Sequence, residues 1–352
     1  MGTFEDSGGW RATLATLTAG QELTAEAAGA AMHEILEGRA TDAQIAGFII
    51  ALRMKGETVG EMVGMVDAML AEASPITLPP GTDAIDIVGT GGAPSRRAHA
   101  LNVSTMACFV VAGAGVAVCK HGNRKASSTS GSSDLLGALG LTVELDGAGV
   151  ARCIAEAGVG FCFARGFHPA MRHAGPVRAE LGVPTVFNFL GPIANPAHVT
   201  RQVIGVSDPA MAPVLIGVLQ QRRLTRAMVV SAHDRTDELV TTGATRVWEL
   251  RDGDVEEYEI HPTDVGLPVV AATAIEGGDE QVNAAIARRV FAGEVGPYRD
   301  IIVLNAAAGL VVGGAVDTIA DGIERASAAI DDGGAAAALA AAVQASQASS
   351  VA

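Results

Sequence analysis

Two polar stretches in the first half of the chain hold residue types that bind anions. The first, DIVGTGG (86–92), places three glycines at the end of a short apolar run. Glycines let backbone N–H groups approach an anion closely, and a helix that starts near Ser104 would add its positive end. The stretch matches neither the Walker loop nor the dinucleotide fingerprint, so taken alone it indicates an anion site and a plain tight turn about equally.

The second stretch, KHGNRKASSTSGSSD (120–134), is more specific. It combines Lys120, Arg124 and Lys125 with five serines and two glycines, directly after the strand-like VAVC. Loops at the carboxyl ends of strands are where α/β proteins place ligands. Many hydrogen-bond donors and several cations suit a phosphate or diphosphate, and they favour that interpretation over a solvated serine-rich linker.

A third stretch, HPAMRHAGPVRAELG (168–182), offers a ligand for a carboxylate. The proline after His168 favours the start of a helix. Arg172 and Arg178 lie near two helical turns apart, so that they can share a side, and an arginine binds a carboxylate bidentately. For Arg172 the sequence alone favours the alternative of a solvated basic face.

A fourth stretch, HDRTDELV (233–240), offers ligands for a metal ion. Asp237 and Glu238 are adjacent and follow the strand-like AMVVSA. Paired carboxylates at a strand end suit Mg²⁺, which takes oxygen ligands and often enters with substrate phosphates. An isolated pair of this kind is most often surface charge. The sequence contains neither a GxSxG elbow nor an HExxH motif, so it does not indicate a serine hydrolase or a zinc protease.

Charge and composition narrow the classes of partner. The formal net charge is −15 and only 4% of residues are aromatic, which disfavours a nucleic acid bound by a broad basic surface or by base stacking. The N-terminal MGTFEDSGGW lacks the basic start and apolar run of a secretory signal, and the apolar stretches fall short of the roughly 20 residues of a membrane helix. We therefore expect a cytoplasmic protein with reduced cysteines and no nucleic-acid or membrane partner.

The elements before the polar stretches are predicted to be helical. Capping-box spacing of Thr41 with Gln44 and of Thr58 with Glu61 marks two helix starts, and Gly56 suits a helix end. Apolar residues recur at helical spacing over 62–70 and predict a core or helix–helix contact. The proline-rich ASPITLPPGTD then indicates a linker between domains.

After the linker, short apolar runs alternate with helical patterns. Strands are expected at AIDIV, VAVCK, GFCFA, RQVIGV, RAMVVSA and DIIVLNAAAG, and helices at STMACFVVAGAG, SSDLLGALG and GVARCIAEAG. This alternation predicts an α/β domain with a largely parallel sheet. The alanine-rich C-terminal stretch is expected to form a last helix with a frayed tail.

Taken in order, these stretches closely resemble anthranilate phosphoribosyltransferases from about residue 20 to about residue 335. The resemblance rests on TAEAAGAAMHEILEGRATDAQIAGFIIALRMKGET, DIVGTGG, NVST, KHGNRKASSTSGSSDLLGALG, HPAMRHAGPVRAELGVPTVFNFLGPIANPA and TDELVTTGAT. It implies an α/β fold with a small all-helical domain (1–78 with 168–190) and a larger α/β domain with a central, mostly parallel sheet (79–167 with 191–352), as in pyrimidine nucleoside phosphorylases. It also implies a homodimer that forms through the helical domains.

The implied reaction is Mg²⁺-dependent transfer of a phosphoribosyl group from 5-phosphoribosyl 1-diphosphate (PRPP) to the amine of anthranilate, a step towards tryptophan. No general base is implied, because the amine is already a free nucleophile. The resemblance assigns anthranilate to Gly89, Asn123 and Arg178, and Mg²⁺ to Ser104, Asp237 and Glu238. It assigns PRPP to Gly89, Gly92, Asn102, Val103, Ser104, Thr105, Lys120, His121, Gly122, Asn123, Arg124, Ser127, Ser128 and Ser132.

The glycine loop departs from the family pattern. Ala93 replaces an aspartate, three residues are added, and Ala100 replaces a threonine, while Arg96 and Arg97 are candidates to take over diphosphate charge. Before the carboxylate pair, Arg-Thr replaces a more usual glycine–hydrophobic pair. Three alternatives therefore stay open: a paralogue with another aromatic amine acceptor, a pyrimidine nucleoside phosphorylase, and a PRPP-binding protein without turnover.

Overall fold

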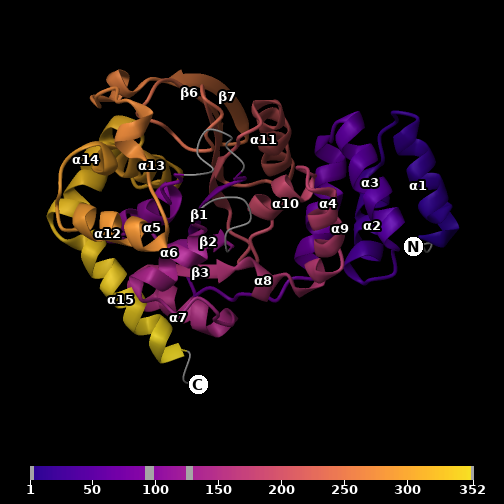
Figure 1. Ribbon diagram of the computed structural model, residues 1–352, viewed down its shortest axis with the longest axis horizontal. Helices are drawn as coiled ribbons and strands as arrows, with labels where there is room; N and C mark the ends of the chain where they lie inside the picture. The colour runs from indigo at the N-terminus through magenta and orange to yellow at the C-terminus, as the bar shows by residue number, and fades with distance from the viewer. Residues whose placement is uncertain (1–3, 92–98, 124–129, 350–352) are drawn as a thin grey trace.

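A computed structural model of the chain describes residues 4–91, 99–123 and 130–349. Two parts lie side by side along its longest axis, a helical part with the N-terminus and a part built around a β-sheet (Figure 1). The helical part comprises η1 (Glu5–Ser7), α1 (Gly9–Thr18), α2 (Ala25–Leu36), α3 (Asp42–Lys55) and α4 (Val59–Ala71). Short helices α9 (Gly175–Leu181) and α10 (Phe187–Ile193) pack against α3 and α4, respectively.

The predicted caps of the helical part are confirmed. Thr41 with Gln44 and Thr58 with Glu61 form reciprocal capping boxes, and Gly56 ends α3 with a φ of 91°. Glu61 is buried, and its carboxylate also accepts hydrogen bonds from the backbone N–H of Leu23 and from Lys55 Nζ. The capping glutamate thus ties the start of α4 to the residues just before α2.

The sheet has seven strands: β1 (Ile85–Gly89), β2 (Val118–Gly122), β3 (Val159–Phe163), β4 (Arg201–Gly205), β5 (Arg226–Ala232), β6 (Thr245–Arg251) and β7 (Asp254–Ile260). Their order is β3-β2-β1-β4-β5-β6-β7. The first five are parallel and the last two add antiparallel strands, which confirms the expected α/β class with a mostly parallel sheet. The chain leaves β1 and β4 towards opposite edges, so a topological switch point lies between them, where such folds bind ligands.

The remaining elements surround this sheet. They are α5 (Val103–Gly113), α6 (Ser132–Leu139), α7 (Gly147–Ala157), α8 (Ala164–Phe167), η3 (Pro169–Arg172), η4 (Pro209–Met211), α11 (Ala212–Gln221), η5 (Pro262–Val265), η6 (Ala272–Ile275), α12 (Glu280–Phe291), α13 (Pro297–Val312), α14 (Ile319–Asp331) and α15 (Gly334–Ser349). The proposed domain boundaries, with 168–190 in the helical domain, stay a prediction.

Three features differ from the sequence expectations. DIIVLNAAAG is helical, within α13, because a helix buried on nearly all sides has the same apolar run as a buried strand. Residues 168–182 form two short pieces, η3 and α9, rather than one helix. The hairpin of β6 and β7 was not expected; its turn residues Asp252 and Gly253 both have positive φ, 54° and 89°, as in a two-residue hairpin turn.

Alternate residues of the strands face two different cores. Met228 and Val230 of β5 point into a cluster with α5, α12, α13 and α14, whereas Ala227 and Val229 point into a cluster with α10, α11 and the helical part. The second cluster is continuous from α1 to β6, so one side of the sheet shares its core with the helical bundle.

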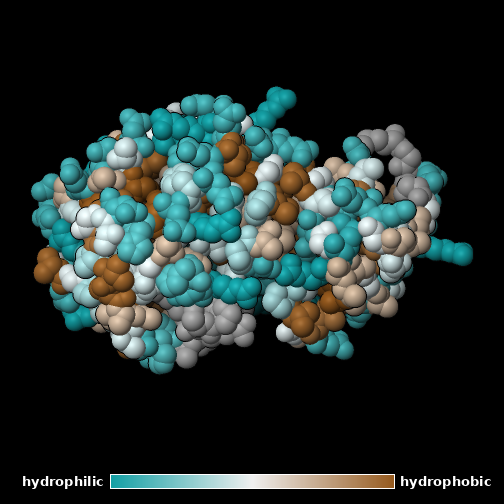
Figure 2. Space-filling view, turned by 90° about the horizontal axis from the view of Figure 1, so that it is seen from above, coloured by the Kyte–Doolittle hydropathy of each residue, from teal (hydrophilic) through white to brown (hydrophobic). Residues whose placement is uncertain are grey.

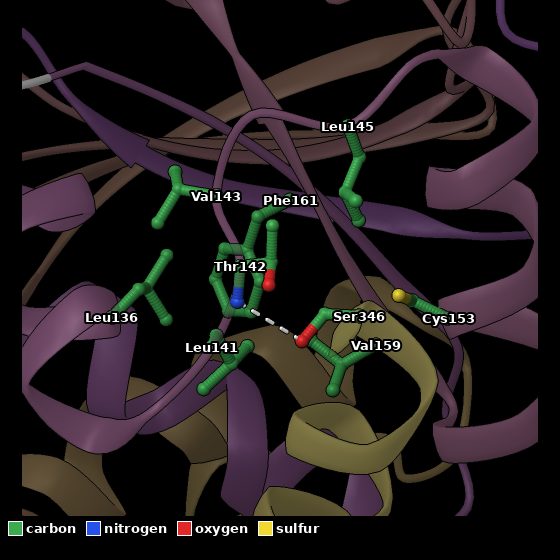
Figure 3. Close-up of a pocket in the computed structure, with 9 residues that line it drawn as sticks. All are labelled: Leu136, Leu141, Thr142, Val143, Leu145, Cys153, Val159, Phe161 and Ser346. Atoms are coloured by element: carbon green, nitrogen blue, oxygen red, sulfur yellow. Dashed lines mark hydrogen bonds between the residues drawn. The ribbon is translucent and has the colours of Figure 1, made fainter. Parts of the chain in front are cut away.

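The alanine-rich C-terminal helix α15 packs against α5 and α7. Ser346 is buried in this contact, and its Oγ accepts a hydrogen bond of 3.1 Å from the backbone N–H of Thr142. Figure 3 shows this bond among the apolar side chains of Leu141, Val159 and Cys153. The expected last helix is therefore confirmed, and part of it belongs to the core.

The surface seen from above is mostly hydrophilic, with apolar residues in small separate patches (Figure 2). Among the described residues, no single helix is long and apolar enough to cross a membrane; only the bent pair of α14 and α15 passes that test together.

Candidate active site

A cavity of about 800 Å³ lies between the helical part and the carboxyl ends of the first strands. The ends of β1 and β2 line it, together with α4, α8, η3, α9 and α10. Its lining includes Met69, Gly89, Thr90, His121, Gly122, Asn123, Arg165, His168, Arg172, Arg178, Phe187 and Gly191. Five residues assigned to substrates from the sequence therefore share one cavity: Gly89, His121, Gly122, Asn123 and Arg178.

The glycine loop after β1 meets the carboxylate pair after β5. The Gly91 N–H donates a hydrogen bond of 2.7 Å to Asp237 Oδ2. This approach depends on glycine at the ends of two neighbouring strands, since Gly89 pairs with Gly205 in register. A Cβ at Gly205 would lie 1.7 Å from the Asp237 carbonyl oxygen, and one at Gly89 would lie 2.3 Å from Asp237 Oδ2.

The backbone after the carboxylate pair is fixed by a buried asparagine. Asn305 of α13 accepts a hydrogen bond from the N–H of Leu239 and donates one of 2.8 Å to its carbonyl oxygen. Asp237 and Glu238 themselves are half-buried. Two half-buried carboxylates beside a backbone that hydrogen bonds hold in place are suited to a divalent cation. The described residues contain no group of three or more His, Cys, Asp or Glu that could hold a metal ion.

Lys120 places a buried positive charge beneath the loops. Its side chain is 1% exposed, and Nζ donates to the carbonyl oxygen of Ile87 and, over 3.3 Å, to Ser104 Oγ. The nearby carboxylate of Asp86 accepts hydrogen bonds from the His121 N–H and from Asn195 Nδ2. Burial raises the pKa of Asp86 to about 6, and the charge of Lys120 opposes that rise.

His121 reaches the cavity as a neutral side chain. Its Nδ1 lies 3.0 Å from the Gly191 carbonyl oxygen, which must accept, so the proton is on Nδ1. Its Nε2 is then a buried acceptor, without a hydrogen-bond partner among the described residues. Burial, with a smaller contribution from the neighbouring His168, lowers the pKa of His121 to about 3; the two ring centroids are 5.1 Å apart.

The two arginines of the third stretch differ in their surroundings. Arg178 lies on α9, half-buried, with its guanidinium 5.1 Å from the ring centroid of Phe187. Burial lowers the pKa of Arg178. Arg172 lies on η3 and is exposed, and it donates to the carbonyl oxygen of Pro169. Both line the cavity, but only Arg178 is held in a partly desolvated position where a carboxylate would bind strongly.

The start of α5 holds four of the sequence-assigned residues. Asn102 is its N-cap residue, yet its side chain makes no capping hydrogen bond. Val103 and Thr105 are buried, whereas Ser104 is half-buried. Ser132 starts α6, and a Cβ at Gly122 would lie 3.2 Å from its Cβ.

Several expectations fall outside the described residues. They concern Gly92, Arg124, Ser127 and Ser128 as PRPP ligands, and the departures at Ala93, Arg96 and Arg97. Conversely, the sequence analysis missed three buried asparagines, Asn195, Asn305 and Asn283. Their side chains form hydrogen bonds with Asp86, Leu239 and Ala100, next to the site residues. An asparagine within an apolar stretch was their only signal, and it does not reveal a partner that lies far along the chain.

Comparisons with known proteins place the chain in a family. Residues 11–73 match the helical bundle domain of the glycosyl transferase family, and residues 81–336 match its a/b domain. The anthranilate phosphoribosyltransferase of Acidothermus cellulolyticus is 51% identical over 349 residues, which cover 97% of each chain. That of Nocardioides sp. is 50% identical over 335 residues, 94% of this chain and 96% of its own length.

Solved structures give the same result. Anthranilate phosphoribosyltransferase from Thermus thermophilus matches with a TM-score of 0.89 and 40% identity, over 95% of this chain and 99% of that one. The Saccharomyces cerevisiae enzyme in complex with PRPP and Mg matches with a TM-score of 0.87 and 25% identity, over 96% and 98%. The chain therefore belongs to the anthranilate phosphoribosyltransferase family and is a transferase.

Proposed function

We propose that the chain transfers the phosphoribosyl group of PRPP to the amine of anthranilate with Mg²⁺, giving N-(5-phosphoribosyl)anthranilate and diphosphate. The observation that carries the proposal is the cavity, which the glycine loop and Arg178 line together. Such a cavity can hold an anionic sugar phosphate and an aromatic carboxylate next to each other. The yeast relative solved with PRPP and Mg, and a variant of it solved with 4-fluoroanthranilate, support the choice of substrates.

The proposed diphosphate end is formed by the glycine loop, Lys120 and the start of α5. Oriented backbone N–H groups and a buried cation stabilise negative charge best where water is excluded. As the C1–oxygen bond of PRPP breaks, its electron pair goes to the diphosphate. Lys120 would then offset part of the developing charge from its buried position.

Mg²⁺ would be held by Ser104, Asp237 and Glu238, whose oxygen donors suit a hard cation. Asp237 lies against the glycine loop and Ser104 against Lys120, so both belong to the proposed diphosphate end. When bound there, Mg²⁺ would neutralise charge on the leaving diphosphate.

At the other end, Arg178 would bind the anthranilate carboxylate, with Gly89 and Asn123 as further contacts. The amine lone pair then attacks C1 of the ribose, and the amine gives up one proton to solvent. Positioning supplies much of the rate, since the amine needs no strong base to become a nucleophile. This agrees with the neutral, low-pKa state of His121 in the cavity.

The decisive test mixes the protein with Mg²⁺, PRPP and anthranilate. We expect anthranilate fluorescence to fall as diphosphate is released, and both changes to stop when Mg²⁺ is chelated. An unchanged fluorescence at saturating PRPP would contradict the proposal. A parallel screen of substituted anthranilates and other aromatic amines would show whether another acceptor is preferred.

The oligomeric state and location are part of the proposal. We propose a homodimer that forms through the helical domains (1–78 with 168–190) and works in the cytoplasm. Four buried cysteines without disulfides support a reducing compartment. Sedimentation equilibrium should give twice the chain mass of 35.6 kDa; a mass of one chain would contradict the dimer.

A further inference from the structure

Asn283 of α12 joins two segments near the proposed diphosphate end, the residues just before α5 and the residues just before α12. Its side chain is fully buried, with 0% exposure. Its Nδ2 donates hydrogen bonds of 2.9 Å to the Ala100 carbonyl oxygen and 2.8 Å to Asn102 Oδ1. Its Oδ1 accepts one of 2.9 Å from the Gly278 N–H. A buried amide with donor and acceptor both satisfied holds its partners in one geometry.

The Asn102 side chain also forms hydrogen bonds with Ser130, in the loop before α6. Its Nδ2 donates to the carbonyl oxygen of Ser130 over 3.1 Å, and its Oδ1 accepts from Ser130 Oγ over 3.0 Å. Ser130 is 2% exposed. The Asn102 oxygen therefore accepts two hydrogen bonds, one from each side, and its orientation is set by Asn283 and Ser130.

This orientation, together with a backbone φ of −82° and ψ of 59°, keeps Asn102 from capping α5. Asparagine is among the most favoured N-cap residues, and its oxygen normally accepts from the second or third helical N–H. Those groups belong here to Ser104 and Thr105, and the Asn102 side chain caps neither of them. Uncapped N–H groups at a helix start attract an anion, and a cap would compete with it.

We propose that Asn283 is a positioning residue for PRPP, which holds the Asn102 amide against Ser130 so that the start of α5 stays open to the diphosphate. The proposal rests on the proposed function, which puts the diphosphate at this helix end. Without Asn283, the residues before α5 lose the hydrogen bonds at Ala100 and Asn102. Asn102 and its backbone are then freer to move towards a capping conformation, and the contact with Ser130 before α6 is weakened. PRPP binding should suffer, whereas Arg178 at the proposed anthranilate end makes none of these contacts.

Two substitutions separate this role from general support of the fold. Asn283→Ala removes all the contacts of the amide. Asn283→Asp is isosteric and keeps an acceptor for the Gly278 N–H, but it can no longer donate to Ala100 and Asn102. Ser346→Ala is the matched control, since it also removes a buried hydrogen bond from a helix of the same part and touches none of these loops (Figure 3).

The measurements are calorimetric affinity for PRPP with Mg²⁺, the KM of each substrate, and the thermal midpoint. We expect both Asn283 variants to bind PRPP about tenfold or more weakly, the range for a lost buried hydrogen bond. The KM of anthranilate should stay within about twofold by the same argument. Ser346→Ala should lower the midpoint and leave PRPP affinity unchanged.

Other outcomes overturn the inference. Wild-type PRPP affinity in Asn283→Ala would show that the amide only supports the fold, and wild-type affinity in Asn283→Asp would show that only the Gly278 contact matters. Equal losses for both substrates would also overturn it. If the wild type binds PRPP but transfers nothing to anthranilate, and the Asn283 variants lose that binding, the proposed function fails while the positioning role stands.

Discussion

Arg178 combines a ring contact, partial burial and a lowered pKa in one side chain. Its guanidinium stacks on Phe187, and burial lowers its pKa without an opposing contribution from a described carboxylate. Arg178→Ala should therefore weaken the binding of an acidic ligand by about 1.5–3 kcal/mol, the range for a hydrogen bond to a charged group. We expect this loss as a raised KM for anthranilate, with a much smaller change for PRPP.

The control for this prediction is Arg172→Ala, since Arg172 lines the same cavity but is exposed. Its effect on the anthranilate KM should be clearly smaller, because water screens an exposed charge. A selective effect of Arg178→Ala on PRPP would mean that α9 serves the other substrate.

His121 should make the folded protein sensitive to acid. Burial lowers its pKa from 6.5 to about 3 in the folded state, so between these values the unfolded chain binds the extra proton. The free energy of unfolding is therefore not reduced by this histidine above pH 6.5, and it decreases as the pH falls from 6.5 towards 3. Asp86 acts in the opposite direction, because its raised pKa lets the folded state take up a proton below about pH 6.

The difference between wild type and His121→Gln isolates the histidine, since Asp86 is present in both. The free energy of unfolding of the wild type should fall relative to that of the variant by up to about 1.4 kcal/mol per pH unit below about pH 6. Urea unfolding at several pH values measures this difference. Parallel pH profiles would show that the pKa of His121 is the same in the folded and the unfolded protein.

For single residues, the sequence identified the functional side chains but not their hydrogen-bond partners. The resemblance named His121, but its bond to Gly191 crosses 70 positions of sequence. The same is true of Asp237 and Gly91, which are 146 positions apart. Motifs identify which side chains carry the chemistry, whereas their fixed orientation comes from contacts that only the fold creates.

At the scale of elements, the paired strand ends of β1 and β4 control how close the carboxylate segment comes. Gly205→Ala would put its Cβ 1.7 Å from a backbone oxygen of Asp237, so the segment must move. We expect a loss of about 1–3 kcal/mol in stability, as for overpacking. We also expect a higher Mg²⁺ concentration for half-maximal diphosphate release.

Gly137→Ala on α6 is a suitable control, because nothing lies within 4 Å of the added Cβ. This change in an exposed helical position should stabilise the protein by about 0.5–1 kcal/mol and leave the Mg²⁺ requirement alone. An unchanged Mg²⁺ requirement in Gly205→Ala would argue against Asp237 as a metal ligand.

Elements with local signals were predictable and those defined by burial were not. The capping boxes of α3 and α4 and the parallel strands up to β5 follow from caps and apolar runs. In α13 the expected strand was wrong, because 12 of its 16 residues are buried and leave no helical periodicity to detect. The β6–β7 hairpin carries a local signal in Asp252-Gly253, but an alternation of strands and helices does not predict it.

At the scale of the whole molecule, the cavity and the shared core lie between the same two parts. The helical part opens towards the strand ends at the cavity, but elsewhere it is joined to α10, α11 and one face of the sheet. Two ion pairs reinforce that junction, Arg53 with Asp208 at 2.6 Å and Arg222 with Asp67 at 3.1 Å. A hinge through a continuous core would expose apolar surface, so we expect substrate entry by local loop motion.

The continuous core also predicts that both parts unfold together. The chain has two tryptophans, Trp10 in α1 and Trp248 in β6, and both belong to the same apolar cluster. In Trp248→Phe the remaining fluorescence reports on the helical part, and in Trp10→Phe it reports on the sheet. Within each variant, the urea midpoint from fluorescence should coincide with the midpoint from circular dichroism, because a core shared by the two parts couples their unfolding. A fluorescence transition of Trp10 that precedes the loss of secondary structure would show instead that the helical part unfolds independently, despite the apolar contacts it makes with α10 and α11.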